Sequence, residues 1–123
     1  MEVKLSLPFP PSINRLWRIG KGNWYCTSEY TQFKDYVCML TRIHKTPKFD
    51  DSARLSVEVY LHPPNKRSLD VDNFCKAVFD SLQDSGVIPN DSQVDELWVE
   101  RKEIVKNGRC EVVIRTIEGT TNV

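Results

Sequence analysis

The sequence predicts an α/β (α+β) fold in which a mixed sheet of about four strands carries two main helices. Residues 2–7 and 54–61 alternate apolar and polar side chains, as half-buried strands do. Two other stretches repeat apolar residues at spacings of three and four, and two β-branched segments close the chain. The order β, α, β, α, β, β most simply packs both helices on one face. With 123 residues, the chain is expected to form one domain, residues 1–123.

Composition and charge narrow the class of protein. Apolar residues make up 40% and charged residues 28%, as in ordinary globular proteins, and no apolar run approaches the roughly 20 residues that span a bilayer. The first residues alternate like a strand and lack the apolar centre of a signal peptide, so we expect a cytoplasmic protein with no membrane partner. The four cysteines form no CxxC pair, and no zinc site is expected.

The net charge is zero, but it is unevenly divided. Residues 1–67 carry 11 Lys and Arg against 6 Asp and Glu, a net of +5, whereas residues 68–123 carry 6 against 11, a net of −5. This division fits a basic surface that faces phosphates beside an acidic metal pocket. A chance distribution of solvated surface charge fits it as well.

The first strand is followed by a segment that prolines hold extended, residues 8–14. It delivers Asn14, Arg15 and Arg18 to one place, together with Trp17. Cations mixed with an aromatic ring suit a phosphate backbone and an exposed base. Taken alone, Trp17 is expected to be a core residue.

The middle of the chain supplies a scaffold. A turn at 20–23 precedes a possible short strand at Trp24 and Tyr25, and an amphipathic helix runs from about 29 to 45 with Ser28 as its N-cap. After the strand at 54–61, a second proline-rich loop leads to Lys66 and Arg67.

A second helix follows, with Phe74, Ala77 and Leu82 on its apolar face, and it stops at Gly86. Residues 97–105 and 110–117 read as strands. Because Asn107-Gly108 lies between them, we expect a closing antiparallel hairpin. Residues 119–123 are expected to be a frayed tail.

Three carboxylates and a lysine surround the second helix. Asp70 and Asp72 lie at its start, Lys76 follows four residues later, and Asp91 lies in the loop beyond its end. Carboxylate oxygens are the ligands that Mg²⁺ or Mn²⁺ prefers. A metal there would activate water toward a phosphodiester, and Lys76 would neutralise charge that develops on the phosphate oxygens.

Each residue also has an ordinary interpretation. Asp70 could cap the helix, Asp72 and Lys76 could form a surface ion pair, and Asp91 could be a turn residue. The loop at 86–91 could return Asp91 toward the helix or carry it away, and the sequence leaves this open.

Two motifs resemble a known family. The chain reads Asp70-x-Asp72-Asn73-x-x-Lys76-Ala77-x-x-Asp80-x-Leu82, then Asn90-Asp91-Ser92-Gln93-Val94, and it opens with Leu7-Pro8-Phe9-Pro10-Pro11-Ser12-x-Asn14-Arg15-x-Trp17-Arg18. Both motifs are similar to those of the RusA family of Holliday junction resolvases, in the same order and over most of the chain.

The resemblance implies a Mg²⁺-dependent endonuclease, with Mn²⁺ as a possible substitute, that binds four-way junction DNA as a homodimer without an organic cofactor. It implies that the carboxylates of Asp70, Asp72 and Asp91 bind the metal and that Lys76 is needed for cleavage. The residues we expect to contact DNA are Asn14, Arg15, Arg18, Lys66, Arg67 and Asn73.

One departure concerns the segment before Asp70. Family members can carry a longer arginine run there, whereas this chain has Lys66 and Arg67 followed by Ser68 and Leu69. Fewer cations would weaken phosphate contacts. Two other functions remain open: a nucleic-acid-binding module without catalysis, and a metal-dependent nuclease for other branched nucleic acids.

Overall fold

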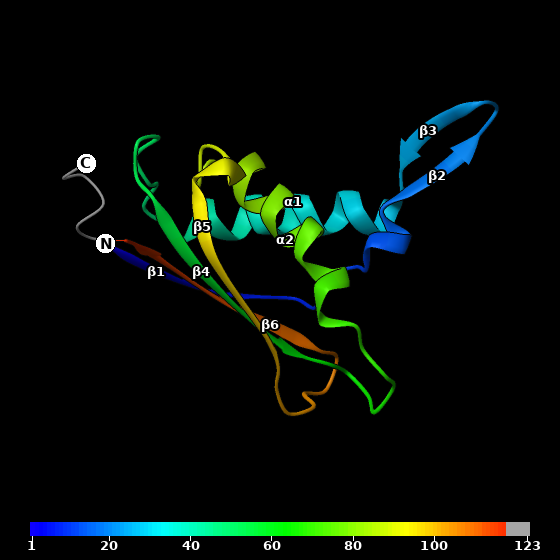
Figure 1. Cartoon of the computed structure of the whole chain (residues 1–123). Coiled ribbons are helices and arrows are strands. Elements are labelled where there is room, and N and C mark those ends of the chain that lie inside the picture. The colour runs from blue at the N-terminus through cyan, green and yellow to red at the C-terminus, as the bar shows by residue number, and fades with distance from the viewer. Residues whose placement is uncertain (118–123) are drawn as a thin grey trace.

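A computed structural model of the chain describes residues 1–117 (Figure 1). The tail expected at 119–123 lies outside these residues. In chain order the elements are β1 (Glu2–Leu7), the 3₁₀ helix η1 (Ile13–Arg15), β2 (Trp17–Gly20), β3 (Asn23–Cys26), α1 (Ser28–Ile43), β4 (Leu55–His62), the 3₁₀ helix η2 (Val71–Phe74), α2 (Cys75–Asp84), the 3₁₀ helix η3 (Asp91–Gln93), β5 (Val94–Arg101) and β6 (Arg109–Thr116). None of the helices in this range is long and apolar enough to cross a membrane.

The main sheet has four strands in the order β1-β6-β4-β5. β6 pairs antiparallel with both β1 and β4, whereas β5 pairs parallel with β4. The parallel pair requires a crossover, and α2 supplies it between β4 and β5. The sheet is therefore mixed, and the predicted α+β architecture of four strands and two helices is confirmed.

The predicted closing hairpin is wrong. β5 and β6 follow one another in the chain, but β4 lies between them. Asn107 and Gly108 do adopt the positive φ values, 69° and 76°, that a tight Asn-Gly turn requires. The turn forms locally within a longer connection, which first continues alongside β4 through a hydrogen bond from the Lys102 N–H to the Leu61 carbonyl, 2.8 Å.

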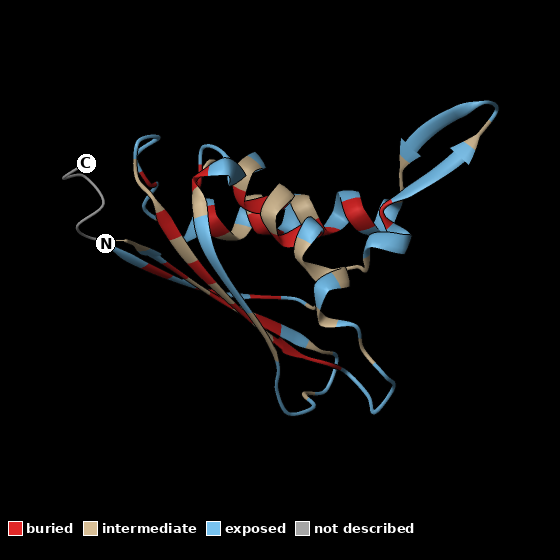
Figure 2. Ribbon diagram, in the orientation of Figure 1, coloured by how far each residue is buried: buried red, intermediate tan, exposed pale blue. Residues whose placement is uncertain are grey.

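Both helices pack on the same face of the sheet, and the core lies between the layers (Figure 2). The inward side chains of β4 are fully buried: Leu55, Val57, Val59 and Leu61. Burial of each such side chain contributes about 1.5–3 kcal/mol. From α1 come Tyr30, Phe33 and Val37, and from α2 come Ala77, Val78 and Leu82. The N-cap of α1 is Thr27 rather than Ser28, because the Thr27 hydroxyl accepts from the Tyr30 N–H.

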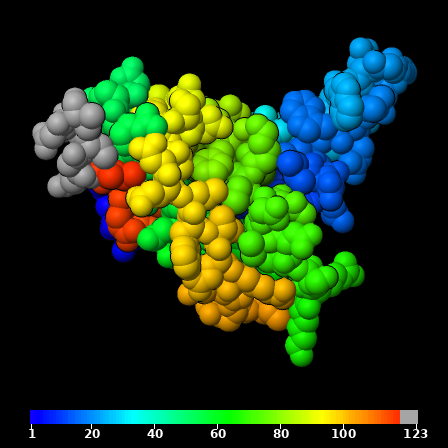
Figure 3. Space-filling model, viewed as in Figure 1, coloured from blue at the N-terminus to red at the C-terminus, as the bar shows by residue number. Residues whose placement is uncertain are grey.

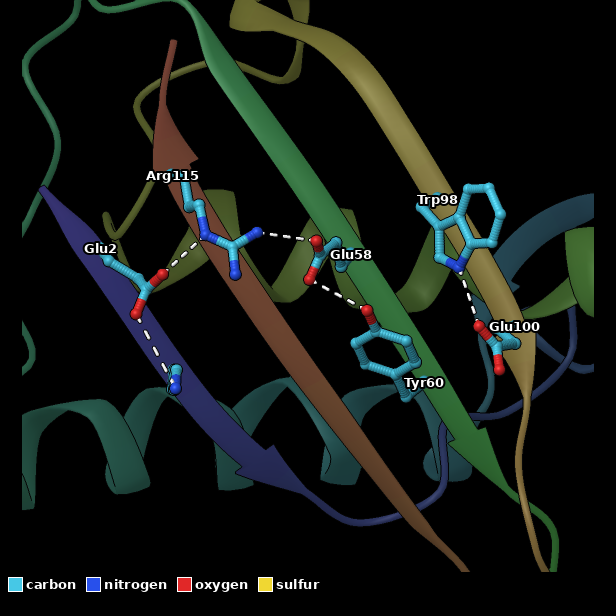
Figure 4. A network of polar contacts seen from close by, with 7 residues as sticks. Glu2, Glu58, Tyr60, Trp98, Glu100 and Arg115 are labelled. Carbon is cyan, nitrogen blue, oxygen red and sulfur yellow. Dashed lines mark hydrogen bonds and ion pairs between the residues drawn. The ribbon is translucent and has the colours of Figure 1, made fainter. Parts of the chain in front are cut away.

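The opposite face of the sheet is polar and carries a network of ion pairs (Figure 4). Arg115 donates to Glu2 at 2.6 Å and to Glu58 at 2.7 Å, and the Tyr60 hydroxyl donates to Glu58 at 3.0 Å. Elsewhere Arg54 pairs with Asp95, Lys102 with Glu100, and Arg109 with Glu111. The pair of Arg54 with Asp95 joins a cation of residues 1–67 to a carboxylate of residues 68–123, so part of the opposite charge of the two halves is neutralised at the sheet, away from α2. The uneven charge of the two halves is not by itself the mark of a metal pocket.

Residues 17–26 form a separate two-stranded hairpin, β2-β3, that projects from the body (Figure 1). β2 was not predicted. Trp17 is exposed and not in the core as its residue type suggested. Leu16, the residue before it, is fully buried instead and anchors the hairpin.

Candidate nucleic-acid interface and carboxylate site

A groove of about 780 Å³ lies between the two proline-rich loops. The loop after β1 forms one wall and the loop after β4 forms the other, and Phe9 contacts Phe74 across them with ring centroids 5.1 Å apart. Prolines suit these walls because they fix an extended backbone and lack the N–H group that helix and strand hydrogen bonds need. In the space-filling view, the molecule is hollowed on the flank between the projecting hairpin and the tip of the loop after β4 (Figure 3).

The groove brings together cations from distant parts of the sequence. Arg15 and Arg67 both line it, together with Asn65 and the aromatic rings of Phe33 and Tyr36. Arginine guanidinium groups beside aromatic rings are the surface that single strands and phosphates require. Leu69, the residue before Asp70, also lines the groove, so the acidic segment begins at its rim.

The other residues predicted to contact DNA are less uniformly placed. Arg18 lies on the hairpin and donates to the Asn14 carbonyl at 3.1 Å, which holds the two residues together. Lys66 is exposed in the loop after β4, and Asn73 lies in η2. Among the elements, η1 and η2 contact each other, so the segments that carry Asn14 and Asn73 are neighbours.

Asp70 and Asp72 lie on a 3₁₀ turn and not on the α-helix itself. Asp70 is the N-cap of η2, and its carbonyl accepts from the Asn73 N–H at 3.0 Å, but its carboxylate makes no capping hydrogen bond. Neither the Asp70 nor the Asp72 carboxylate forms a hydrogen bond or ion pair with any residue in the range 1–117. Capping therefore does not account for Asp70, and both groups remain available to a ligand.

Lys76 pairs with Asp80 and not with Asp72. Its ammonium group lies 3.0 Å from the Asp80 carboxylate, one turn further along α2. The Tyr30 hydroxyl of α1 donates to the other oxygen of the same carboxylate. The ion pair predicted between Asp72 and Lys76 is absent from the described structure because Asp72 lies in the tighter 3₁₀ turn, where the α-helical i, i+4 spacing does not hold.

Asp80 is the most perturbed carboxylate of this region. Burial and, less strongly, the nearby charges of Asp84 and Asp91 raise the pKa of Asp80 to about 6. The ammonium group of Lys76 and the hydroxyl of Tyr30 act in the opposite direction, because both favour the ionised form. Burial prevails because the Asp80 side chain is only 15% exposed.

The loop after α2 returns Asp91 to the helix. The Asp91 N–H donates to the side-chain oxygen of Gln83 in the last turn of α2, at 3.0 Å. A capping box fixes the loop: the Asn90 side chain accepts from the Ser92 N–H, and the Gln93 side chain accepts from the Asn90 N–H. The buried Gln93 amide also donates to two carbonyls near residue 50. The sequence motif at 90–93 is thus a device that positions Asp91.

The chemistry of the three carboxylates suits a hard divalent cation, but their positions in the structure do not yet form a site for one. Three carboxylates and no histidine are typical of a magnesium or manganese site. However, within residues 1–117 no three His, Cys, Asp or Glu side chains are grouped closely enough to hold a metal ion. The electrostatic neighbour of Asp91 is Asp80. The structure therefore returns Asp91 to α2, but it does not assemble Asp70, Asp72 and Asp91 into a three-ligand site.

Asp80 and Tyr30 were missed by sequence reasoning as members of this cluster. Asp80 follows Lys76 by four residues, a spacing that allows an ion pair, although the reverse order, with Asp72 before Lys76, is the more favourable one on an α-helix. Tyr30 carries no such signal, because its contact with Asp80 joins two helices 50 residues apart.

A groove lined by arginines and aromatic rings, with the exposed carboxylates of Asp70 and Asp72 next to its rim, is typical of small α+β proteins that bind nucleic-acid phosphates. The model of the endodeoxyribonuclease RusA family matches residues 8–115, and the chain belongs to this family.

Its relatives are similar in length as well as in sequence. The crossover junction endodeoxyribonuclease RusA of Shigella sonnei strain Ss046 is 35% identical over 112 residues, which cover 89% of this chain and 91% of that protein. The protein of the same name from Escherichia coli strain K12 is 34% identical over the same coverage. That of Enterobacteria phage HK97 is 32% identical over 117 residues, 95% of this chain and 97% of the relative.

Proposed function

We propose that this protein is a Mg²⁺-dependent, structure-specific endodeoxyribonuclease that resolves four-way DNA junctions. The observation that carries the proposal is the groove in which Arg15 and Arg67 converge beside the free carboxylates of Asp70 and Asp72. Membership of the RusA family supports the reaction, since relatives matched over about nine-tenths of their length are named crossover junction endodeoxyribonucleases.

The reaction is the hydrolysis of a phosphodiester. The oxygen of a water molecule forms a bond to phosphorus, the bond from phosphorus to the 3′ oxygen breaks, and a proton passes to that oxygen. The products carry a 5′-phosphate and a 3′-hydroxyl. A divalent metal, when bound, supplies polarisation of the phosphate and acidification of water.

The chain's own residues take the following roles in this proposal. Asp70, Asp72 and Asp91 would supply carboxylate oxygens to the metal, and because they are not grouped into a three-ligand site within residues 1–117, their side chains would have to move together when the metal binds. Lys76 faces the phosphate and stabilises the charge that develops on its oxygens in the transition state. Asp80 and Tyr30 hold the Lys76 ammonium group at the helix when no DNA is present.

The surface around the groove holds the DNA backbone. Phosphate contacts are assigned to Asn14, Arg15, Arg18, Lys66, Arg67 and Asn73. Because Ser68 and Leu69 replace part of the longer arginine run that other family members can carry, we expect a weaker dependence of binding on salt than a fully basic loop would give.

A homodimer matches the substrate. A four-way junction has two-fold symmetry, so two copies of one site related by a two-fold axis meet equivalent phosphates on opposing strands. We propose that the dimer works in the cytoplasm and needs no organic cofactor.

The test is cleavage of a synthetic four-way junction with Mg²⁺, with EDTA and with the variant Asp70→Asn. We expect cleavage only by the parent protein with Mg²⁺, and a loss of at least about 100-fold in rate for Asp70→Asn with junction binding retained. Asp35→Asn, which removes an equal charge from the exposed side of α1, is the matched control and should cleave normally.

Other outcomes separate the remaining functions. Binding without cleavage under every metal condition would identify a nucleic-acid-binding module. Equal or faster cleavage of flaps would identify a nuclease for other branched nucleic acids.

A further inference from the structure

The β2-β3 hairpin exposes large apolar side chains that nothing in the fold covers. Trp24 is 69% exposed, Ile19 62%, Tyr25 51% and Trp17 43%. The hairpin stands clear of the body, and the four-stranded sheet does not extend to it (Figures 1 and 3). A two-stranded ribbon of this kind is marginally stable in water by itself, and exposed apolar patches mark binding sites. We therefore expect its aromatic surface to bind a ligand.

The register places three of these side chains on one face. Ile19 is directly opposite Trp24, and Trp17 is directly opposite Cys26, so alternation puts Trp17, Ile19 and Trp24 on the same side of the ribbon. Tyr25 lies on the other side, opposite Arg18, with its ring against the backbone of Gly20: a Cβ at Gly20 would lie 2.9 Å from the ring. Each side of the hairpin thus presents an aromatic ring.

The charge of the hairpin selects the kind of ligand. Between Glu2 and Glu29 the chain has no acidic residue, whereas Arg15, Arg18 and Lys21 lie on or beside the hairpin. At the base of the hairpin Arg15 pairs with Glu29 of α1 at 3.8 Å, whereas β2, β3 and the turn between them carry cations and rings but no carboxylate. Such a surface fits a polyanion whose flat apolar groups are exposed. Unpaired nucleobases on a phosphate backbone have this chemistry, because every base has a stacking face.

The base of the hairpin is connected to the proposed cleavage centre. The Trp17 ring packs edge-on against Tyr30, with centroids 5.9 Å apart. Tyr30 donates to Asp80, which holds Lys76. Thr27 closes the base of the hairpin, since its hydroxyl donates to the Arg15 carbonyl and its N–H donates to the Leu16 carbonyl at 3.0 Å.

We propose that the β2-β3 hairpin is a stacking wedge that takes unpaired bases at the branch point of the junction, with Trp24 and Ile19 as the contact surface. The inference rests on the proposed function. It adds a reason for structure specificity: plain duplex keeps its bases stacked and has none to offer the hairpin, whereas a branch point does.

The test compares Trp24→Ala with Trp24→Phe and with the control Trp98→Ala, which removes another exposed tryptophan, 59% exposed, from β5 at the polar face of the sheet. Affinity is measured for a four-way junction and for plain duplex with Mg²⁺ replaced by Ca²⁺. A 2-aminopurine base at the branch point reports stacking by its fluorescence. We expect Trp24→Ala to lose junction affinity by on the order of 10-fold and to abolish the fluorescence change, with duplex affinity nearly unchanged. Trp24→Phe and Trp98→Ala should retain both.

Three results would overturn the inference. If the parent protein binds junctions and Trp24→Ala binds them equally well, the hairpin is not a stacking wedge, and the proposed function is unaffected. A shift of Trp24→Ala from dimer to monomer in sedimentation identifies the occupant as a second copy of the chain. A parent protein that neither prefers nor cleaves junctions removes the proposed function, and the inference with it. Because Trp24 is exposed, Trp24→Ala should melt at the temperature of the parent, which excludes misfolding.

Discussion

Lys76 illustrates how local geometry chooses between two partners. Asp72 and Asp80 both lie four residues from Lys76, and the order of acid before lysine favours Asp72 on a continuous α-helix. The backbone decides, because Asp72 belongs to η2 and Asp80 to α2. A consequence is that Asp72 keeps its carboxylate free, while Asp80 is held by Lys76 and Tyr30.

The raised pKa of Asp80 makes the stability of the protein depend on pH. The folded state holds this proton more tightly than the unfolded chain, since the pKa rises from 3.8 to about 6. The contribution of Asp80 to the free energy of unfolding is therefore full below about pH 3.8 and is lost as the pH rises through about 6.

Asp80→Asn removes this dependence. The quantity to follow is the difference in the free energy of unfolding, parent minus Asp80→Asn. We expect this difference to fall between about pH 4 and pH 6 and to be constant above about pH 7. Urea unfolding of both proteins at a series of pH values measures the difference. A difference that rises with pH over this interval would mean that the ion pair with Lys76, and not burial, dominates Asp80.

At the scale of elements, the groove depends on how closely the proline-rich loops approach one another. Gly108, in the turn before β6, lies against Phe9: a Cβ there would be 2.7 Å from the Phe9 Cβ, and the residue has a φ of +76°. Gly22, at the tip of the hairpin, has a similar φ of +79° but no atom within 4 Å of the corresponding position. Comparing substitutions at the two glycines therefore distinguishes the cost of a left-handed backbone from the cost of a steric clash.

Gly22→Ala should therefore cost about 1–2 kcal/mol of stability, the cost of a left-handed backbone. Gly108→Ala should cost about a further 1–3 kcal/mol, because the added methyl group overpacks Phe9. Urea unfolding of the parent and both variants, fitted with the same dependence of the free energy of unfolding on urea concentration, measures the two losses of stability. Equal losses would show that Phe9 moves aside freely and that the loop is not held by this contact.

Elements with a strong periodic pattern were predicted correctly, and those set by long-range contacts were not. β1, α1, β4 and α2 lie close to their expected ranges because alternation or helical spacing follows from a buried face. The pairing of β5 with β4 was missed because Asn107-Gly108 determines a turn and not the strand that lies across from it. β2 was missed because its alternation of Trp17 and Ile19 with Arg18 and Gly20 spans only four residues and corresponds to no buried face.

The same limit applies to the candidate site. The motif identifies Asp70, Lys76 and Asp91 as candidate site residues. Only the structure shows that hydrogen bonds to the side chains of Gln83 and Gln93 bring the loop with Asp91 back to α2. The relation between Asp91 and Asp80 joins a loop to a helix face, and sequence spacing carries no information about it.

At the scale of the whole molecule, one flank carries the candidate function. The groove, the turn that carries Asp70 and Asp72, the contacts of Lys76 with Asp80 and the β2-β3 hairpin all lie outside the four-stranded sheet. The outer face of that sheet is occupied by its own ion pairs (Figure 4). A two-fold dimer of such units would present two identical flanks to a junction that has the same symmetry.

The most direct test of the central claim is a map of the cut sites on a four-way junction whose four strands are labelled in turn at the 5′ end. We predict nicks at equivalent positions in two opposing strands, products that DNA ligase seals, and no cleavage of plain duplex with the same sequence. Cuts confined to one strand, ends that ligase cannot join, or equal cleavage of the duplex would contradict the account.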